Sequence, residues 1–433
     1  MLIGMNRPQI RVERATDDER YVATDQIVWF EENPDVSTSE LLTGLPADQR
    51  FAVDTVESGD AAGTDDSSYA GIYGVRPLDL AVPGGVAGRA QLVPCAGLTW
   101  VGVHPDHRRR GILTAMLRHH VEQTHREGVA LSALHASEPA IYGRHGYGVA
   151  SHTHTVTLGS GTKLQAPGLD ATARALRTRF ATSSDPGIAK RVRECELHAA
   201  TASPGMTVAE ESYYAFIVNS SRWPEQKRDK EPLRFLFAER DGEDAGLVAF
   251  RRFHHWEGGR PQGRVEVFDL RGEPAVRLAL LRRLLEFDLV STVVVSHVGD
   301  DDPIWSWVGP RGTEKVEAHE NLWIRIIDLP EALALRAYAG DCDVVVDVED
   351  PAAPWQAGVW RIRVRDGAAN AERTDDPAEI TLPIAVLGAA YLGGTNLVAM
   401  HRAGLLDERR AGAVAQLWRA FRTDLAPDPS LNF

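Results

Sequence analysis

Apolar positions in the first third of the chain follow two different periods, and each period predicts a different element. Residues 98–103 form an apolar run that is typical of a buried strand. The apolar positions that recur at helical spacing after the next turn are Ile112, Leu113, Met116, Leu117 and Val121. This spacing predicts a helix that packs one face on a sheet. Gly128 ends the helix, and residues 130–135 return as a short strand.

The preceding residues predict two helices and two further strands. The helical stretches are 17–30 and 37–45, and the strands are 50–56 and 69–75. Pro83-Gly84-Gly85 marks a turn before the strand at 98. The order of three strands, one helix and another strand predicts an α/β or α+β domain of about 150 residues. We expect this domain to occupy residues 1–158.

The middle of the chain repeats this order. A glycine-rich and proline-bearing segment at 159–168 is typical of a linker, and a helix is predicted at 189–198. Three strands, one helix and one strand follow, at 234–239, 245–253, 263–270, 275–287 and 291–297. The turn before the helix is Arg271-Gly-Glu-Pro274, which has a carboxylate and a proline where phosphate would need free N–H groups. We therefore interpret residues 159–327 as a structural copy without a cofactor.

The last region, residues 328–433, predicts a third domain of mixed composition. Strands are expected at 343–348, 360–365 and 379–381, and helices at 384–391 and 412–422. The fold class is thus α+β or α/β, with two similar domains followed by a third. A chain of 433 residues is long enough for roughly three domains.

Composition and charge narrow the class of protein. The chain has 43% apolar and 25% charged residues, which is typical of a globular protein. A net charge of -14 argues against a general nucleic-acid binder. It favours cationic partners, or serves solubility alone. Cys95, Cys195 and Cys342 have neither metal-site nor disulfide spacing, and no run is apolar enough to span a membrane, so we expect a cytoplasmic protein without a metal.

The basic turn His107-Arg-Arg-Arg-Gly111 joins the strand at 98–103 to the helix that starts at Ile112. A turn of this kind directs several backbone N–H groups and the positive end of the helix dipole at one point. Three consecutive arginines suit a ligand with more than one phosphate, because guanidinium groups bind phosphate oxygens in pairs. The combination points to coenzyme A.

A signature in this stretch resembles the enhanced-intracellular-survival (Eis) family of GNAT acetyltransferases. It consists of Val101-Gly-Val103, Pro105, the basic turn, Ala136-Ser-Glu138 and Ile141-Tyr-Gly-Arg-His-Gly-Tyr-Gly148. The resemblance implies two GNAT-like domains and a third that resembles sterol carrier proteins. It also implies acetyl-CoA as co-substrate, transfer to one or more amines of an acceptor, and a homo-hexamer.

The resemblance assigns roles residue by residue. Acetyl-CoA would lie on Val101, Gly102, Val103, Arg109, Arg110, Gly111, Ile112, Leu113 and Thr114, bordered by Ser137 and Glu138. Tyr142 would be the general acid, and the α-carboxylate of Phe433 the base. Two departures, His145 and Pro139-Ala140, would reshape the pocket near Tyr142.

The chemistry of acetyl transfer fits these residue types. A tyrosine with a reference pKa of about 10 is matched to a thiol leaving group of about 8.5. A terminal carboxylate with a reference pKa near 3.5 is a poor match for an ammonium with a pKa near 10, unless burial raises the pKa of the carboxylate or water relays the proton. Its charge would also attract a polyamine. Either role requires the residues before Phe433 to fold back into a cleft.

Two questions stay open at the level of sequence. Trp29, Phe30, Glu31 and Glu32 either line an amine pocket through cation–π faces and carboxylates or form a solvated helix end. The favoured function is direct acetyl transfer to a polycationic acceptor, which is aminoglycoside-like, a polyamine or a lysine side chain. The alternative is a non-catalytic acyl-CoA sensor, or a carrier of an apolar ligand in the third domain. Amine-dependent release of free thiol distinguishes the two.

Overall fold

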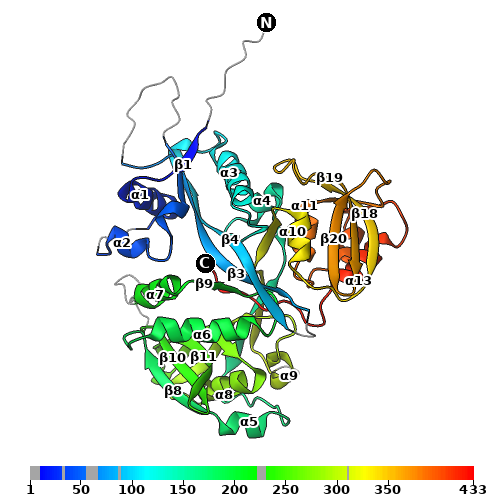
Figure 1. The fold of residues 1–433 in the computed structure, drawn as a ribbon. Helices are drawn as coiled ribbons and strands as arrows, with labels where there is room; N and C mark the ends of the chain where they lie inside the picture. The colour runs from blue at the N-terminus through cyan, green and yellow to red at the C-terminus, as the bar shows by residue number, and fades with distance from the viewer. Residues whose placement is uncertain (1–9, 32–34, 55–66, 86–88, 222–230, 310–311) are drawn as a thin grey trace.

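The computed structural model describes residues 10–31, 35–54, 67–85, 89–221, 231–309 and 312–433. Figure 1 shows three lobes around a central sheet, with the last residues of the chain returning to the middle of the molecule. The lobes correspond to two similar α/β units and a smaller third unit.

The first sheet has the strand order β1-β2-β3-β4-β5-β17-β6, and β9 pairs with β3. Its strands are β1 Val12–Arg14, β2 Arg50–Val53, β3 Gly71–Pro83, β4 Ala90–Val103, β5 Leu131–Leu134, β6 Gly148–Val149, β9 Thr207–Ala209 and β17 Trp323–Ile326. Its helices are α1 Asp18–Trp29, α2 Thr38–Leu41, α3 Ile112–Arg126 and α4 Pro139–Tyr142, with short 3-10 turns η1 Ala47–Gln49, η2 Pro105–His107 and η3 Gly143–His145.

The second sheet has the order β16-β7-β15-β14-β11-β10-β8. Its strands are β7 His152–Gly159, β8 Arg177–Thr182, β10 Arg234–Arg240, β11 Glu243–Phe253, β14 Gly263–Gly272, β15 Val290–Val298 and β16 Lys315–Glu320, and β12 Trp256–Glu257 pairs separately with β13 Arg260–Pro261. Its helices are α5 Asp170–Ala175, α6 Ile188–Ala200, α7 Glu211–Ser220, α8 Pro274–Leu285 and α9 Ile304–Val308.

The third unit has a sheet in the order β20-β19-β18-β21-β22. Its strands are β18 Cys342–Glu349, β19 Gly358–Arg365, β20 Ala368–Arg373, β21 Ile380–Pro383 and β22 Asp407–Glu408. Its helices are α10 Leu329–Ala334, α11 Ile384–Ala390, α12 Leu397–Arg402 and α13 Ala413–Phe421.

The predicted helix after the basic turn forms as α3. Its face with Ile112, Met116, Leu117 and Val121 is buried, as the helical spacing indicates. The predicted strand at 98–103 is only the second half of β4, which pairs with β3 along a hairpin from Gly71↔Val103 to Pro83↔Ala90. The hairpin is longer than predicted because its far half packs on the third unit. The local sequence pattern of the hairpin does not indicate this contact.

The first two sheets exchange strands along the chain. β17, which follows the second unit in sequence, inserts between β5 and β6 of the first sheet. β7, from the end of the first region, lies between β15 and β16 of the second sheet. The two units are therefore interlocked rather than joined by a simple linker.

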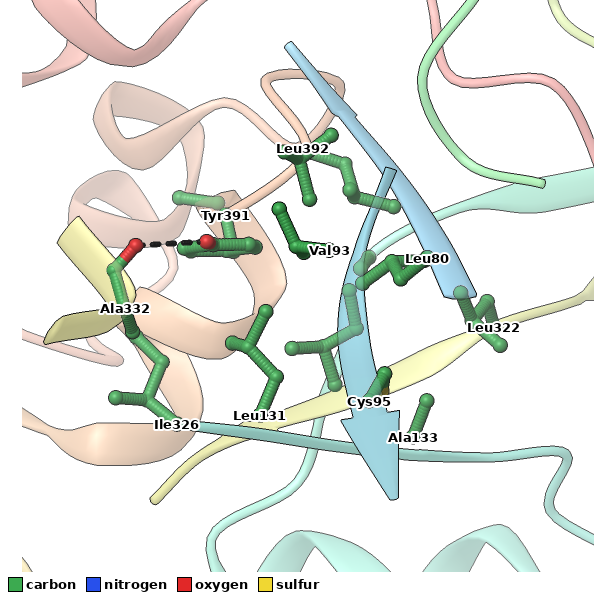
Figure 2. Close-up of a cluster of buried hydrophobic side chains, with 14 of the residues drawn as sticks. Leu80, Val93, Cys95, Leu131, Ala133, Leu322, Ile326, Ala332, Tyr391 and Leu392 are labelled. Atoms are coloured by element: carbon green, nitrogen blue, oxygen red, sulfur yellow. Dashed lines mark hydrogen bonds between the residues drawn. The ribbon is translucent and has the colours of Figure 1, made fainter. Parts of the chain in front are cut away.

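A single hydrophobic core connects the first sheet to the third unit. Figure 2 shows Leu80, Val93 and Cys95 of the hairpin and Leu131 of β5 facing Tyr391. The hydroxyl of Tyr391 donates to the carbonyl of Ala332 at 2.7 Å. This buried contact satisfies the one polar group of the aromatic side chain.

An ion pair in the same interface fixes β17. Arg325 is fully buried and donates from Nη2 to both carboxylate oxygens of Asp350 at 2.9 Å. Gln356 donates to the same carboxylate at 2.8 Å. Removing one partner of such a pair leaves an uncompensated buried charge, which typically costs about 3–5 kcal/mol.

Candidate active site

The turn between β4 and α3 has the backbone of an anion site. Arg109 and Gly111 both take left-handed conformations, with φ of 61° and 89°. Gly111 is the N-cap of α3, and no side chain of the described residues caps the first turn of this helix. Its first N–H groups therefore remain available to a ligand, at the positive end of a helix of 15 residues.

The side chains of this turn add positive charge. Arg108, Arg109 and Arg110 are all exposed beside the start of α3. Burial, followed by nearby Arg110, lowers the pKa of His107, so this histidine adds little charge at neutral pH. The guanidinium groups thus provide the charge, and the residues fit the diphosphate of acetyl-CoA.

The edge of β4 opens where β5 diverges from it. The two strands pair in parallel only at Ala96↔Ser132 and Gly97↔Ala133. Beyond Gly97, β4 continues to Val103, and Trp100 takes a left-handed conformation with φ of 54° within a bulge opposite β3. Val101, Gly102 and Val103 lie on this segment, whose β5-facing edge has no strand partner in the described chain. Its backbone groups can bond an amide-bearing ligand.

Tyr142 ends α4 on the α3 side of the first sheet. It is buried in one cluster with Ala96, Leu98 and Met116, and its ring centre lies 6.1 Å from that of Tyr147. Burial raises the pKa of Tyr142. The phenol therefore stays protonated at neutral pH and is available as a proton donor. Ser137 and Glu138, immediately before α4, are exposed.

Phe433 approaches β4 from the opposite face. Thr99 donates its hydroxyl to the main-chain oxygen of Phe433 at 3.1 Å. A Cβ on Gly97 would lie 2.9 Å from the Phe433 ring, so only glycine admits this close approach. Because alternate residues of a strand face opposite sides, Gly97 points away from the Ala96 and Leu98 cluster that holds Tyr142.

The predicted amine-binding group is brought together only in part. Trp29 and Phe30 end α1 with 46% and 90% of their surface exposed, and Glu31 is also exposed. Glu32 lies outside the described residues. These residues form no enclosed aromatic pocket among the described residues.

Asp25 is an acidic residue on α1 that the sequence analysis missed. Burial and nearby Glu31 raise its pKa to about 7, although a hydrogen bond with Trp29 works in the opposite direction. α1 packs over β4, where Val28 contacts Gly102. The signal in the sequence was an acid four residues before Trp29, on the same face of the helix.

No group of three potential metal ligands occurs among the described residues. All three cysteines are buried, and burial raises the pKa of Cys95, Cys195 and Cys342. None of them is therefore activated as a thiolate. No described helix combines the length and apolar character required to cross a membrane.

Comparisons with known proteins agree with this architecture. Two regions, residues 9–150 and 215–326, match families described as acetyltransferase (GNAT) domains, and residues 329–428 match a sterol carrier protein domain. An uncharacterized N-acetyltransferase of Streptomyces avermitilis is 36% identical over 370 residues, covering 84% of this chain and 86% of the relative. N-acetyltransferase Eis of Mycobacterium tuberculosis is 28% identical over 382 residues, covering 85% and 86%.

Solved structures show the same fold. Eis1 from Mycobacterium abscessus superposes with a TM-score of 0.78 at 24% identity, covering 98% of this chain and all of that one. A GCN5-related N-acetyltransferase from Kribbella flavida gives 0.71 at 21% identity, with the same coverage. The chain belongs to the Eis family of GNAT N-acetyltransferases. The predicted tandem GNAT fold with a sterol-carrier-like domain is confirmed, as is its class as an N-acetyltransferase, and the GNAT fold implies acetyl-CoA as co-substrate.

Proposed function

We propose that the enzyme transfers acetyl groups directly to primary amines of polycationic acceptors, with Tyr142 as general acid and the Phe433 carboxylate as base. The observation that carries this proposal is the convergence of the two residues on β4 from opposite faces of the first sheet. A donor lying along the open edge of β4 would have the acid on one side and the base on the other. Acids and bases that act in one ternary complex need this arrangement.

The co-substrate supplies an acetyl thioester, and the chain supplies its binding site. Arg109, Arg110 and Gly111, with the first turn of α3 at Ile112, Leu113 and Thr114, would hold the diphosphate. The free edge at Val101, Gly102 and Val103 would bond the amide arm, with Ser137 and Glu138 bordering the pocket. An N–H of this edge would also polarise the thioester carbonyl.

Three proton transfers complete this mechanism. Tyr142 would donate its proton to the sulfur as the carbon–sulfur bond breaks, so that neutral thiol departs. The Phe433 carboxylate would accept a proton from the acceptor ammonium, directly or through water, so that a neutral amine attacks. As the tetrahedral intermediate collapses, the attacking nitrogen would lose its second proton, which would return through water to the Tyr142 phenolate. His135 contacts Phe433, and burial lowers the pKa of this histidine to about 4. It is therefore neutral at pH 7 and adds no competing positive charge.

Acidic groups near β4 support a cationic acceptor. Asp25 lies on the helix that covers this strand, Glu31 follows the end of that helix, and the chain carries a net charge of -14. Aminoglycosides, polyamines and lysine side chains share the required primary amines. Following the resemblance, we also propose a homo-hexamer, which light scattering of purified protein tests directly.

Thiol release from acetyl-CoA with a panel of amines tests the function. Spermidine, an aminoglycoside and a lysine peptide are expected to be acetylated, whereas a neutral alcohol of similar size is not. Deleting residues 431–433, or adding residues after Phe433, is expected to abolish transfer while acetyl-CoA binding persists. Cofactor binding without amine-dependent thiol would instead support the sensor alternative. Full activity of the shortened chain would show that the base lies elsewhere.

A further inference from the structure

The last eight residues, 426–433, form a segment that we call the strap. Figure 1 shows the red end of the chain running from the third unit, after α13, toward the centre of the molecule, where the C-terminus lies beside β9 and β3. Along this path the strap bonds the second unit at Ala426, Pro429 and Asn432, and it ends at Thr99 of the first sheet. The contacts at the start of the strap lie in a cleft of the second unit.

That cleft is the counterpart of the acetyl-CoA site. In the first unit the site lies where β4 leads through a turn into α3 while β5 diverges. In the second unit β14 leads through Gly272 into α8, and β14 pairs in parallel with β15 only from Gly263↔Val290 to Val267↔Val295. Beyond that point the strands separate, and the His297 imidazole bonds the carbonyl of Phe268 at 2.9 Å. The second unit therefore has the same opening.

Strap residues occupy one wall of this opening. A cavity of about 180 Å³ is lined there by Arg271 and Gly272 at the end of β14, by Arg277 on α8, and by Asp428 and Pro429. Arg271 donates from Nη2 to the carbonyl of Pro429 at 3.3 Å. The strap thus lies where the first unit would receive a diphosphate.

Arg271 is held by two buried acids. Its Nε lies 2.8 Å from Asp269 and 3.2 Å from Glu196, and all three side chains are buried. Burial works to lower the pKa of Arg271, but Asp269, Glu196 and Asp428 outweigh it and raise the pKa. The guanidinium is consequently a fixed charge that presents Nη2 to the strap.

Asp428 lines the same cavity as Arg271 and Arg277. Burial raises the pKa of its carboxyl, and the positive charges of Arg277 and Arg271 oppose that shift. Its backbone N–H donates to the carbonyl of Pro204 at 2.7 Å. Gly205, with φ of 114°, approaches the Asp428 carbonyl so closely that a Cβ would lie 2.3 Å from the oxygen. The backbone around Asp428 is therefore fixed on two sides.

The strap residues after Pro429 form further hydrogen bonds on the way to the first sheet. Asn321 donates to the carbonyl of Ser430 at 3.0 Å and accepts from its N–H at 2.8 Å, as a neighbouring strand would. The Ser430 hydroxyl bonds Thr207, and Tyr213 donates to the carbonyl of Asn432. Each step between Asp428 and Phe433 is thus defined by a contact.

We propose that the degenerate cofactor cleft of the second unit anchors the strap, with Asp428 taking the place of a phosphate, and thereby sets the position of Phe433 in the active site. Arg271 and Asp428 are positioning residues in this scheme, because they touch neither co-substrate nor acceptor. The proposal rests on the proposed role of Phe433. It gives the second unit a part in catalysis although that unit binds no cofactor of its own.

The test uses the full chain and the variant Asp428→Ala, with Asp244→Ala as matched control. Asp244 pairs with Arg191 on the second unit, at 2.7 Å, and lies outside the strap. Carboxypeptidase release of Phe433 reports strap position independently of activity. We expect release to accelerate about tenfold or more in Asp428→Ala, and kcat to fall by a similar factor with unchanged acetyl-CoA affinity. The control is expected to change neither quantity.

Other outcomes separate the two proposals. Unchanged release and unchanged kcat in Asp428→Ala would overturn the anchor, as would an equal loss of kcat in the Asp244→Ala control. Accelerated release together with full activity of the chain lacking residues 431–433 would support the anchor and refute the base. Should Asp428→Ala fail to fold, Asp428→Asn decides, because it removes the carboxylate charge and keeps the size of the side chain. Faster release of Phe433 from that variant supports the anchor, and unchanged release overturns it.

Discussion

The ring of Phe433 stands edge-on to the imidazole of His135, with 4.9 Å between the ring centres. His135 follows directly after β5, so this contact ties the end of the strap to the point where β5 leaves β4. The position of Phe433 therefore depends on the first sheet as well as on the second unit.

Replacing Tyr142 by Phe is expected to lower kcat by about 10²–10⁴-fold, since general acid catalysis typically contributes that much. Acetyl-CoA affinity, measured by calorimetry, should stay within twofold of the original value, roughly the scatter of a neutral change. Tyr338→Phe is the matched control, because it removes the hydroxyl of another buried tyrosine, which donates to the carbonyl of Leu333 at 2.8 Å in the third unit. Equal kcat for the two variants would remove Tyr142 from the mechanism.

Gly111→Ala is expected to weaken acetyl-CoA binding. Alanine strains the left-handed backbone at φ of 89°, and the turn can relax only by moving its N–H groups. We expect a loss of stability of about 1–3 kcal/mol and a Kd raised about tenfold. Gly128→Ala, at φ of 71° beyond the other end of α3, should lose similar stability without any change in Kd. A raised Kd in both variants would indicate a general effect on α3.

Asp25→Asn is expected to weaken the preference for polycations. With a pKa of about 7, Asp25 gains its charge as the pH rises through neutrality. The kcat/KM for spermidine should therefore rise more steeply through this pH range than the kcat/KM for a monoamine. The Asp25→Asn variant should lose this difference between the two amines, which we expect to be roughly tenfold. Identical pH profiles for the two amines in the unchanged enzyme would place the acceptor away from Asp25.

Acid is expected to destabilise the fold through His135. Burial lowers its folded-state pKa from 6.5 to about 4, so between these values the unfolded chain binds more protons than the folded one. The free energy of unfolding should fall as the pH drops from 6.5 to 4, by about 3 kcal/mol from this group alone. Urea titrations of His135→Gln should show a shallower dependence, whereas exposed His152→Gln should match the original chain.

The local parts of the site could be predicted from sequence, because their information is local. The strand, the turn to Gly111 and α3 lie in one continuous stretch, with an apolar pattern that changes period at the turn. The second unit was recognisable for the same reason. Neighbouring residues determine such features through backbone conformation and helical spacing.

The parts that escaped prediction depend on pairings between distant residues. β17 contains Arg325, which contradicts the pattern of a buried strand until Asp350 is known to face it. Asp25 is an ordinary helical acid in sequence, and only its packing raises its pKa. The anchor at Asp428 required the position of Arg271 across the fold. Burial, register and ion pairing between such residues are decided by tertiary structure, which periodicity does not encode.

The insertion of β17 between β5 and β6 has a consequence for attempts to dissect the enzyme. A fragment that stops at residue 158 retains the basic turn before α3 but leaves β5 with an open edge, and unpaired strand edges recruit other chains. Such fragments are expected to aggregate instead of forming a minimal catalytic module. Recombination that swaps the first region between relatives must accordingly carry residues 323–326 with it, although more than 160 positions separate the two in the sequence.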